Sequence, residues 1–251
     1  MTHMNTPAPY PAERRIRVDA KKFAAACNFI SREKTRYYLN GVHIEPHVNG
    51  GVLMVATDGH TLAAVYDPTG IADGPHICPV SPRLRQAARS RKPHFAHAVA
   101  AEGKQPEHSQ KQIHFVGHVA YLTGGTASVH WESNPVEKIS SAHIHTEFSP
   151  AIDGTFPEWR RVVPDLINRV WQPDGSRPFA INGEKIAQFT DAIHLISGSR
   201  GRALTFHAAG RSEPIGIVSH DVPEFFGIIM PMRGRDCPAN PVWLENKAPT
   251  E

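Results

Sequence analysis

The chain has few of the features that mark several protein classes. Its 251 residues contain only three cysteines, Cys27, Cys78 and Cys237, and no Cys-x-x-Cys pair. This spacing indicates neither a zinc site nor a disulfide framework, and it fits a reducing cytoplasm. No run approaches the roughly 20 apolar residues that a membrane helix needs. The N-terminus also lacks the apolar core of a secretion signal, so membrane and secreted classes are not expected.

Net charge is also small. A formal charge of +3 is too low for a protein that coats DNA through a generally cationic surface, although it permits a local basic face. The charged fraction of 20% and the apolar fraction of 40% are typical of a soluble globular protein. The length allows one large domain or two small ones.

What the sequence does contain is one order of elements three times: strand, helix, strand, strand, strand. The expected strands cover residues 15–18, 38–45, 53–57, 62–66, 77–80, 95–100, 112–122, 127–131, 142–148, 177–181, 203–208, 215–219 and 225–230. Asp19, Ser81 and Asn182 suit the N-caps of the three helices, and Gly198 suits the end of the third. This repetition favours an α+β fold built from pseudo-symmetric domains.

The three expected helices differ in their exposed faces. The first would bury Ala20, Phe23, Ala24, Cys27 and Ile30, with Lys21, Lys22, Asn28 and Ser31 off that stripe. The third would bury Ile186, Phe189, Ile193 and Ile196. The second is strongly basic: its apolar Leu84, Ala87 and Ala88 are surrounded by Arg83, Arg85, Arg89, Arg91 and Lys92.

A tight turn is predicted at Asp58-Gly59. The dipeptide lies between two apolar runs, residues 53–56 and 61–66. Glycine accepts a positive φ, and aspartate hydrogen-bonds to its own backbone, so the pair is typical of a β-hairpin tip.

Four motifs identify a family. They are Arg36-Tyr37-Tyr38-Leu39-Asn40-Gly41, Val55-Ala56-Thr57-Asp58-Gly59-His60-x-Leu62-Ala63, Phe156-Pro157-x-x-Arg160-Arg161-Val162-x-Pro164 and Met230-Pro231-Met232-Arg233. In this order and at these spacings they closely resemble the bacterial sliding clamp, the beta subunit of replicative DNA polymerase III. The resemblance covers roughly residues 14 to 235.

The resemblance implies a DNA clamp fold built from repeated βαβββ units. It implies a DNA polymerase processivity factor that binds duplex DNA non-specifically and captures clamp-binding peptides of replication and repair proteins. Its further partners would be the polymerase, a clamp loader and copies of itself. A cytoplasmic, non-catalytic protein with no cofactor and no membrane association is expected.

The chain departs from the family in length. Family members have three domains, each made of two βαβββ halves, and they form a ring as a head-to-tail dimer. Here residues 14–164 resemble the whole middle domain and residues 165–235 only the second half of the last domain. Residues 1–13 are expected to be a disordered tail and residues 236–251 a C-terminal tail. One and a half domains cannot build the family's ring in the same way, although four chains would supply twelve halves.

The resemblance also implies a peptide pocket between two domains. The matching residues are Leu39, Thr57, Gly59, His60, Leu62, Pro157, Arg161, Val162, Ile228, Met230, Pro231, Met232 and Arg233. Methionine and leucine form a deformable apolar floor, and Gly59 would let a ligand backbone approach closely. Thr61 stands where family members often have arginine. The alternative interpretation is that these residues only pack a domain interface.

Basic residues near the three helices are candidates for phosphate contacts. They are Lys21, Lys22, Arg32, Lys34, Arg83, Arg85, Arg89, Arg91, Lys92, Lys185, Arg200 and Arg202, together with Arg36, Tyr37 and Tyr38 in a loop that matches a DNA-touching family loop. The alternative is a solvated cationic face without a ligand.

Three other possibilities stay open. The chain could be an interaction protein that keeps the pocket, lacks the ring, and adapts or sequesters clamp-binding partners. A metal-dependent enzyme is weakly suggested by His143-x-His145 and His114-x-x-x-His118, which lack a convincing third ligand. In the C-terminal tail, Val242-Trp243-Leu244 could dock into the pocket and compete with partners, or it could simply pack on the domain surface. If it docks, deleting residues 236–251 should tighten peptide binding.

Overall fold

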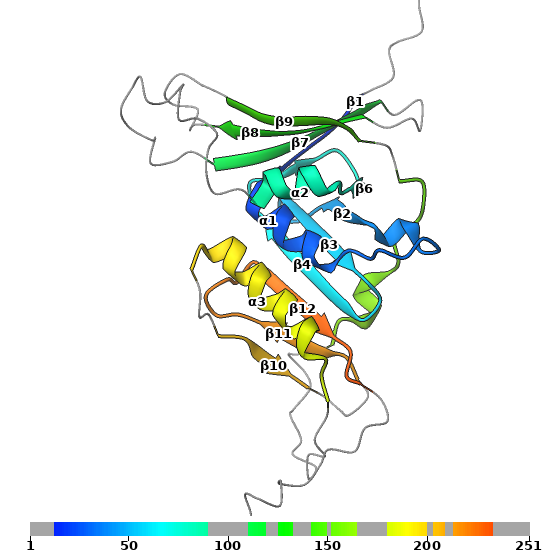
Figure 1. The fold of residues 1–251 in the computed structure, drawn as a ribbon, viewed down its shortest axis with the longest axis vertical. Helices are drawn as coiled ribbons and strands as arrows, with labels where there is room; N and C mark the ends of the chain where they lie inside the picture. The colour runs from blue at the N-terminus through cyan, green and yellow to red at the C-terminus, as the bar shows by residue number, and fades with distance from the viewer. Residues whose placement is uncertain are drawn as a thin grey trace, which may run out of the picture.

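The computed structural model describes residues 13–89, 110–118, 125–132, 142–149, 152–164, 180–199, 203–208 and 213–232. Predicted features at residues 1–12, 95–100, 177–179 and 233–251 lie outside these ranges. Within them, two antiparallel sheets and three α-helices form the fold shown in Figure 1.

The first sheet has five strands in the order β5-β1-β7-β8-β9. These are β5 (Ile71–Ala72), β1 (Glu13–Asp19), β7 (Gln110–His118), β8 (Gly125–Glu132) and β9 (Ala142–Ser149). The second sheet has seven strands in the order β10-β11-β12-β4-β3-β2-β6. These are β10 (Thr205–His207), β11 (Ile215–Val218), β12 (Phe225–Ile229), β4 (Thr61–Asp67), β3 (Val52–Thr57), β2 (Gly41–Pro46) and β6 (His76–Pro79).

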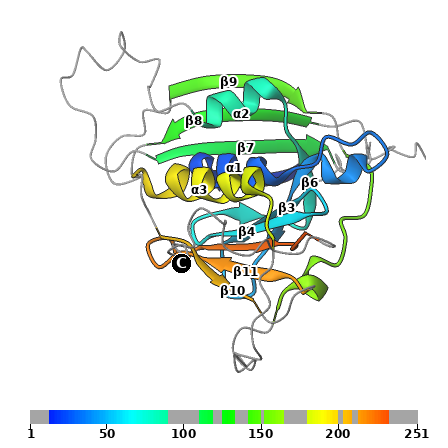
Figure 2. The ribbon, with the colours of Figure 1, turned by 60° about the horizontal axis from the view of Figure 1, so that its bottom comes forward.

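The helices begin where the sequence predicts. In α1 (Ala20–Ala26), Asp19 accepts a hydrogen bond from the Lys22 backbone N–H, and in α3 (Gly183–Ser197) Asn182 accepts one from Glu184. Helix α2 (Pro82–Arg89) follows Ser81, whose hydroxyl accepts from Leu84 N–H. Short 3₁₀ turns complete the helical content: η1 (Cys27–Phe29), η2 (Tyr37–Leu39) and η3 (Trp159–Val162). Helices α1 and α3 lie side by side in both ribbon views (Figures 1 and 2).

The first repeat comprises β1, α1 and β2–β4, the second comprises β6, α2 and β7–β9, and the third comprises α3 and β10–β12. The first two repeats exchange their first strands. Strand β1 leaves the first repeat and pairs with β7, the strand that follows α2. Strand β6 likewise leaves the second repeat and pairs with β2. The third repeat joins differently, because its last strand β12 pairs with β4, the last strand of the first repeat. The predicted α+β architecture of repeated βαβββ units is therefore confirmed.

One apolar core runs through the first and third repeats. Phe29 of η1 meets Phe189 of α3 edge to face, with ring centroids 4.8 Å apart, and Phe225 of β12 lies 6.2 Å from Phe29. All three rings are buried. Gly227 lies beneath this contact, since a Cβ added there would come within 2.4 Å of Phe189 Cε1. The missing side chain at residue 227 thus lets α3 settle onto β12.

Several sequence predictions were wrong in detail. The strand expected at 38–45 begins at Gly41, because residues 37–39 form the η2 turn instead. Strand β5 and turn η3 were not predicted. Asn28 and Ser31 were placed off the buried stripe, yet both are buried, at 9% and 4% exposure. Of the strand expected at 177–181, Ala180 forms an isolated bridge to Met232.

Within the ranges that the structure describes, no helix is both long and apolar enough to cross a membrane.

Replacing Gly227 with alanine should destabilise the protein. The new Cβ would collide with Phe189 and force α3 away from β12, which we expect to lower the free energy of unfolding by about 1–3 kcal/mol. For a chain of this size, each kcal/mol lowers Tm by roughly 2–4 °C. Gly74→Ala is the matched control, because nothing lies within 4 Å of a Cβ there. Equal melting temperatures for the two variants would contradict the close contact.

Candidate functional site

The tip of the β3–β4 hairpin is fixed by its own side chains. Asp58 Oδ1 accepts hydrogen bonds from the backbone N–H groups of His60 (2.9 Å) and Thr61 (2.8 Å). The Thr57 hydroxyl donates to Thr61 O at 2.7 Å and accepts from Gly59 N–H at 3.0 Å. Gly59 has φ +87°, the left-handed region that favours glycine. The predicted turn is therefore present, and it leaves His60 exposed.

Residues near the far end of the chain dock on this tip. Strand β12 pairs with β4 so that Ile228 lies opposite Leu62. Beyond the strand, Met230 N–H donates to His60 O at 2.9 Å, and Met232 N–H donates to Ala180 O at 2.8 Å. The second and fourth motifs thus meet in space.

Beneath this junction lies an apolar cluster that also takes in the first and third motifs. Leu39, Leu62 and Ile228 are buried there together with Phe156, and Trp159 of η3 packs against them. His43 stacks on Phe156 with ring centroids 4.7 Å apart, and Arg160 pairs with Glu45, so β2 holds the η3 segment in place. Pro157, Arg161, Val162 and Met232 are exposed, Thr57 and Met230 are half-buried, and Pro231 is buried.

The predicted site residues therefore divide into two groups. Leu39, Leu62 and Ile228 form a buried floor, while Val162 and Met232, at 45% and 41% exposure, stand at the surface. Arg233 lies outside the described residues. Trp159 packs against the cluster that contains Ile228, so η3 is attached to the same buried floor.

Gly59 and Thr61, two residues expected to shape the rim of the pocket, have other neighbours in the structure. The group that approaches Gly59 is the Arg36 guanidinium, since a Cβ at Gly59 would lie 2.5 Å from Arg36 Nη1. Arg36 is itself held by Glu33, with Nη2 to Oε1 at 2.6 Å. Thr61, at the position where family members often have arginine, is only 2% exposed and donates to Asp58. It belongs to the turn and not to a rim.

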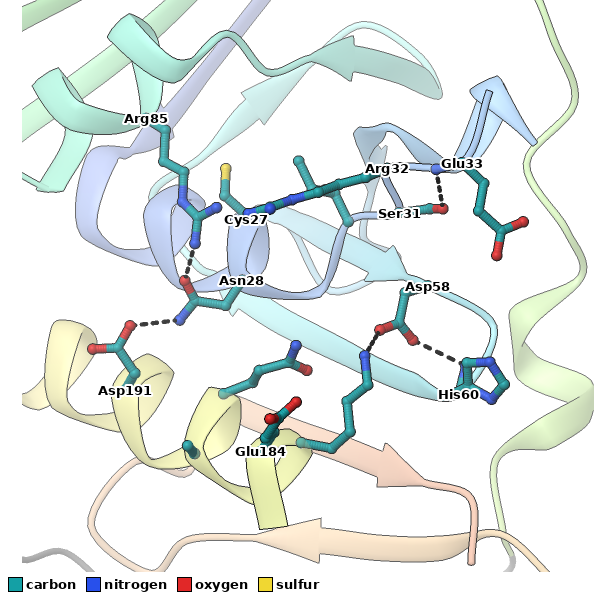
Figure 3. Close-up of a pocket in the computed structure, with 14 residues that line it drawn as sticks. Cys27, Asn28, Ser31, Arg32, Glu33, Asp58, His60, Arg85, Glu184 and Asp191 are labelled. Carbon is teal, nitrogen blue, oxygen red and sulfur yellow. Dashed lines mark hydrogen bonds and ion pairs between the residues drawn. The ribbon is translucent and has the colours of Figure 1, made fainter. Parts of the chain in front are cut away.

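A separate polar cleft lies next to the junction (Figure 3). It has a volume of about 770 Å³ and opens between η1, the hairpin tip, α2 and α3. Of the predicted peptide-site residues, only His60 lines it. Its charged lining is mixed in sign, with Arg32, Arg85 and Lys185 facing Glu33, Asp58, Glu184 and Asp191.

Two of the acidic groups in this lining, Asp58 and Asp191, are paired with cations of other elements or turns. Lys185 of α3 bonds to Asp58 Oδ2. Burial by itself would raise the pKa of Asp58, but Lys185 and the N–H groups of Thr61 and His60 outweigh it, so the pKa lies below its ordinary value. Asp58 therefore links the hairpin tip to the third repeat as a carboxylate.

A second link passes through Asn28, which the sequence did not single out. Its Oδ1 accepts from Arg85 at 2.7 Å and its Nδ2 donates to Asp191 at 3.1 Å (Figure 3). The same Oδ1 also accepts from Arg89 at 3.1 Å. Arg89 completes the network by pairing with Asp191 at 2.8 Å. One side chain of η1 thus connects α2 with α3.

The predicted DNA-binding residues are accordingly not all available as surface charge. Arg36, Arg85, Arg89 and Lys185 have the partners described above, and Lys22 bonds to Tyr66 O and pairs with Glu224 at 3.6 Å. Lys21, Arg32, Lys34, Arg83 and Tyr37 are exposed, and Tyr38 is half-buried. Arg91, Lys92, Arg200 and Arg202 lie outside the described residues.

Metal ligands do not gather in the described ranges. No group of three or more His, Cys, Asp and Glu side chains there could hold a metal ion. The side chains of the two histidine pairs considered from the sequence lie outside what the structure describes. Cys27 and Cys78 are buried free thiols, and burial raises the pKa of Cys27 to about 12.

Comparison with known proteins points to one family. The beta sliding clamps of two Caulobacter vibrioides strains are each 26% identical to this chain over 192 residues. The matched region is 74% of this chain and 40% of each relative, so the chain spans well under two thirds of their length. No protein-family model matches the chain.

Solved structures agree on the architecture. A DNA polymerase III subunit beta from Pseudomonas aeruginosa superposes with a TM-score of 0.54 at 14% identity, covering 92% of this chain and 69% of that one. The Borrelia burgdorferi subunit, in complex with a natural product, gives 0.53 at 14% identity, covering 92% and 66%. This chain has the DNA-clamp fold. The predicted resemblance to bacterial sliding clamps, in a shortened form, is confirmed.

Asp58→Asn should change how the stability of this clamp fold depends on pH. A carboxylate whose pKa is depressed by folding stabilises above its unfolded pKa of about 3.9, and that stabilisation is lost as the pH falls through the folded pKa. We expect Asp58→Asn to cost about 1–2 kcal/mol of unfolding free energy at pH 7. Urea unfolding should show this difference shrinking below pH ~4. Asp153→Asn, at an exposed position, is the control, and an equal loss for both variants would contradict the role of Asp58.

Proposed function

We propose that this chain is a sliding-clamp-like processivity factor that holds duplex DNA non-specifically and captures clamp-binding peptides of replication and repair proteins. The observation that carries the proposal is the meeting of four separate sequence motifs around one apolar floor. Leu39, Leu62 and Phe156 come from the first three motifs and share that floor with Ile228, which lies two residues before the fourth motif. If these residues only packed a core, Val162 and Met232 would not need to be exposed.

Peptide capture fits the chemistry of this surface. An extended peptide could bury apolar side chains against Val162 and Met232, above the floor of Leu62 and Ile228. Methionine adapts its shape to different partners, which suits a site that serves several proteins. Arg161 is exposed next to Val162 and can hydrogen-bond to peptide carbonyls or acidic flanks.

We also propose that residues 14–164 form one clamp domain and residues 165–235 half of another. Support comes from the exchange of β1 and β6 between the first two repeats, which binds them into one unit. The third repeat shares no such exchange among its described residues and is attached through β12. Domains joined strand to strand in this way can build larger assemblies.

Binding to DNA would rest on the exposed cations of the helices. Lys21 on α1 and Arg83 on α2 are exposed, whereas Arg85, Arg89 and Lys185 are engaged with Asn28, Asp191 and Asp58. Non-specific affinity for DNA depends on the number of phosphates that are neutralised. Fewer available cations would give a weaker and less salt-dependent interaction.

The same pairing favours a second candidate, an adapter that keeps the peptide site without a ring. Such a protein would bind the same peptides as a clamp and compete for them. The charge pairs across the cleft serve the joint between repeats equally well in an adapter. Affinity for DNA separates the two functions.

Peptide capture can be tested with a fluorescein-labelled Gln-Leu-Ser-Leu-Phe peptide. We expect measurable binding by fluorescence anisotropy, and a loss of at least roughly tenfold in Val162→Glu or Met232→Glu, because a carboxylate would have to be desolvated in the apolar contact. Both residues are exposed, so the substitutions should leave the fold intact. Val48→Glu is the matched control, since Val48 is 94% exposed in the β2–β3 turn. No binding by the unmodified chain would contradict both candidate functions.

DNA binding can be tested with a random-sequence duplex at several salt concentrations. If Lys21 and Arg83 contact phosphates, replacing both with alanine should weaken binding and reduce the slope of log K against log salt by about 2. Replacing the paired residue Lys22 with alanine should change this slope less, because its ammonium group already has protein partners. The adapter would be favoured if the chain stays monomeric and binds the peptide but does not bind DNA, even at low salt.

A further inference from the structure

Exposed apolar side chains stand at two places, where η3 ends and where the chain leaves β12, and both segments adjoin the buried cluster that contains Ile228. Val162 and Val163 at the end of η3 are 45% and 37% exposed, and Met232 is 41% exposed. We call these three residues the apolar rim. Trp159, in the same turn as Val162, packs on the buried cluster that contains Ile228. A rim of this kind above a buried apolar floor favours contact with another apolar group.

The backbone between β12 and Met232 is fixed on both sides. Met230 donates to the hairpin tip at His60 O, and Met232 donates to Ala180 O just before α3. The isolated bridge between Ala180 and Met232 holds the same point. Whatever follows Met232 therefore starts at the apolar rim itself.

The sequence after Met232 carries one compact apolar group. Val242-Trp243-Leu244 follows after about ten residues, which include Pro238 and Pro241. Ten residues reach at most about 35 Å, and a random-coil chain of that length has a root-mean-square span of about 16–19 Å. The two prolines oppose a regular helix or central strand in the tether. The triplet therefore stays within about 35 Å of Met232, which includes the rim.

We propose that Val242-Trp243-Leu244 docks on the apolar rim of its own chain and competes there with external peptides. The proposal rests on the peptide-binding function proposed above and adds its regulation. Tryptophan offers a large apolar area for a shallow site, and leucine and valine match the aliphatic rim. Charge is complementary as well, because Glu245 follows the triplet and Arg161 is exposed beside Val162.

The tether makes weak docking effective. A short flexible linker holds its ligand at an effective concentration on the order of 1 mM. If the free triplet bound with a dissociation constant of roughly 100 µM, the closed form would outweigh the open form about tenfold. An external peptide would then bind about tenfold more weakly than it does to a chain without the triplet.

The test uses the full chain with a single change, Trp243→Glu, and the labelled Gln-Leu-Ser-Leu-Phe peptide. We expect this variant to bind the probe about tenfold more tightly than the unmodified chain. Asn240→Asp is the matched control, since it adds the same charge in the same tail and should leave the affinity unchanged. A Trp243→Glu variant whose affinity equals that of the unmodified chain overturns the proposal, as does an equal gain in the control.

Hydrogen–deuterium exchange supplies a readout that does not depend on the probe. Docking should slow exchange at residues 159–163 and 230–232 in the unmodified chain relative to Trp243→Glu, with no change at the distant turn 47–51. Protection that grows with protein concentration would mean that the tail of a second copy binds, which overturns docking within one chain. Protection without any binding of the probe would support the docked tail and contradict the proposed peptide capture, so the two failures are distinguishable.

Discussion

The pairing of β12 with β4 is the interaction on which the rest of the arrangement depends. An exposed strand edge leaves backbone N–H and C=O groups without partners, and each edge here satisfies the other along residues 225–229 and 61–65. The pairing continues one repeat into another, so the core passes without interruption from Phe29 to Phe225. It also brings Ile228 to Leu62 and Met230 to His60. Without this register, the floor of the candidate peptide site would not exist.

Charge reinforces the same joint. Asp58 on the hairpin tip and Asp191 on α3 take up Lys185 and Arg89, and Asn28 connects the arginines of α2 to α3. Partly buried pairs of this kind fix orientation more than they add stability. Their cost is that these cations no longer present full charge to a polyanion. The helices that look most basic in the sequence are therefore partly neutralised by the packing of the third repeat.

The parts that the sequence predicted are those decided by local chemistry. The Asp58-Gly59 turn, the caps at Asp19 and Asn182 and the end of α3 at Gly198 each depend on a few adjacent residues. The motif resemblance placed Leu62 and Ile228 in one pocket, although no local pattern links them, and the two residues are paired in the structure. 

What the sequence did not predict depends on contacts between distant segments. Asn28 lies off the apolar stripe of α1, so periodicity placed it in solvent, whereas α2 and α3 together enclose it. Arg36 was predicted to contact DNA, which stays a prediction; that its guanidinium would also lie against the backbone of Gly59 and pair with Glu33 was not foreseen. In both cases a partner lies on a distant segment, α2 and α3 for Asn28 and the hairpin tip for Arg36, and only the folded chain fixes its position.

The two proposed activities make different demands on assembly. The proposed peptide surface would draw on residues of one chain only, since its floor and rim come from the first repeat, η3 and the end of β12. Encirclement of DNA needs more, because the first two repeats complete their sheets by exchanging strands and the third does not among its described residues. Strand β10, whose three residues are all exposed, is the edge that such an exchange would cover. On the proposed functions, a single chain would suffice to capture peptides, whereas topological retention on DNA would require that another chain complete the third repeat.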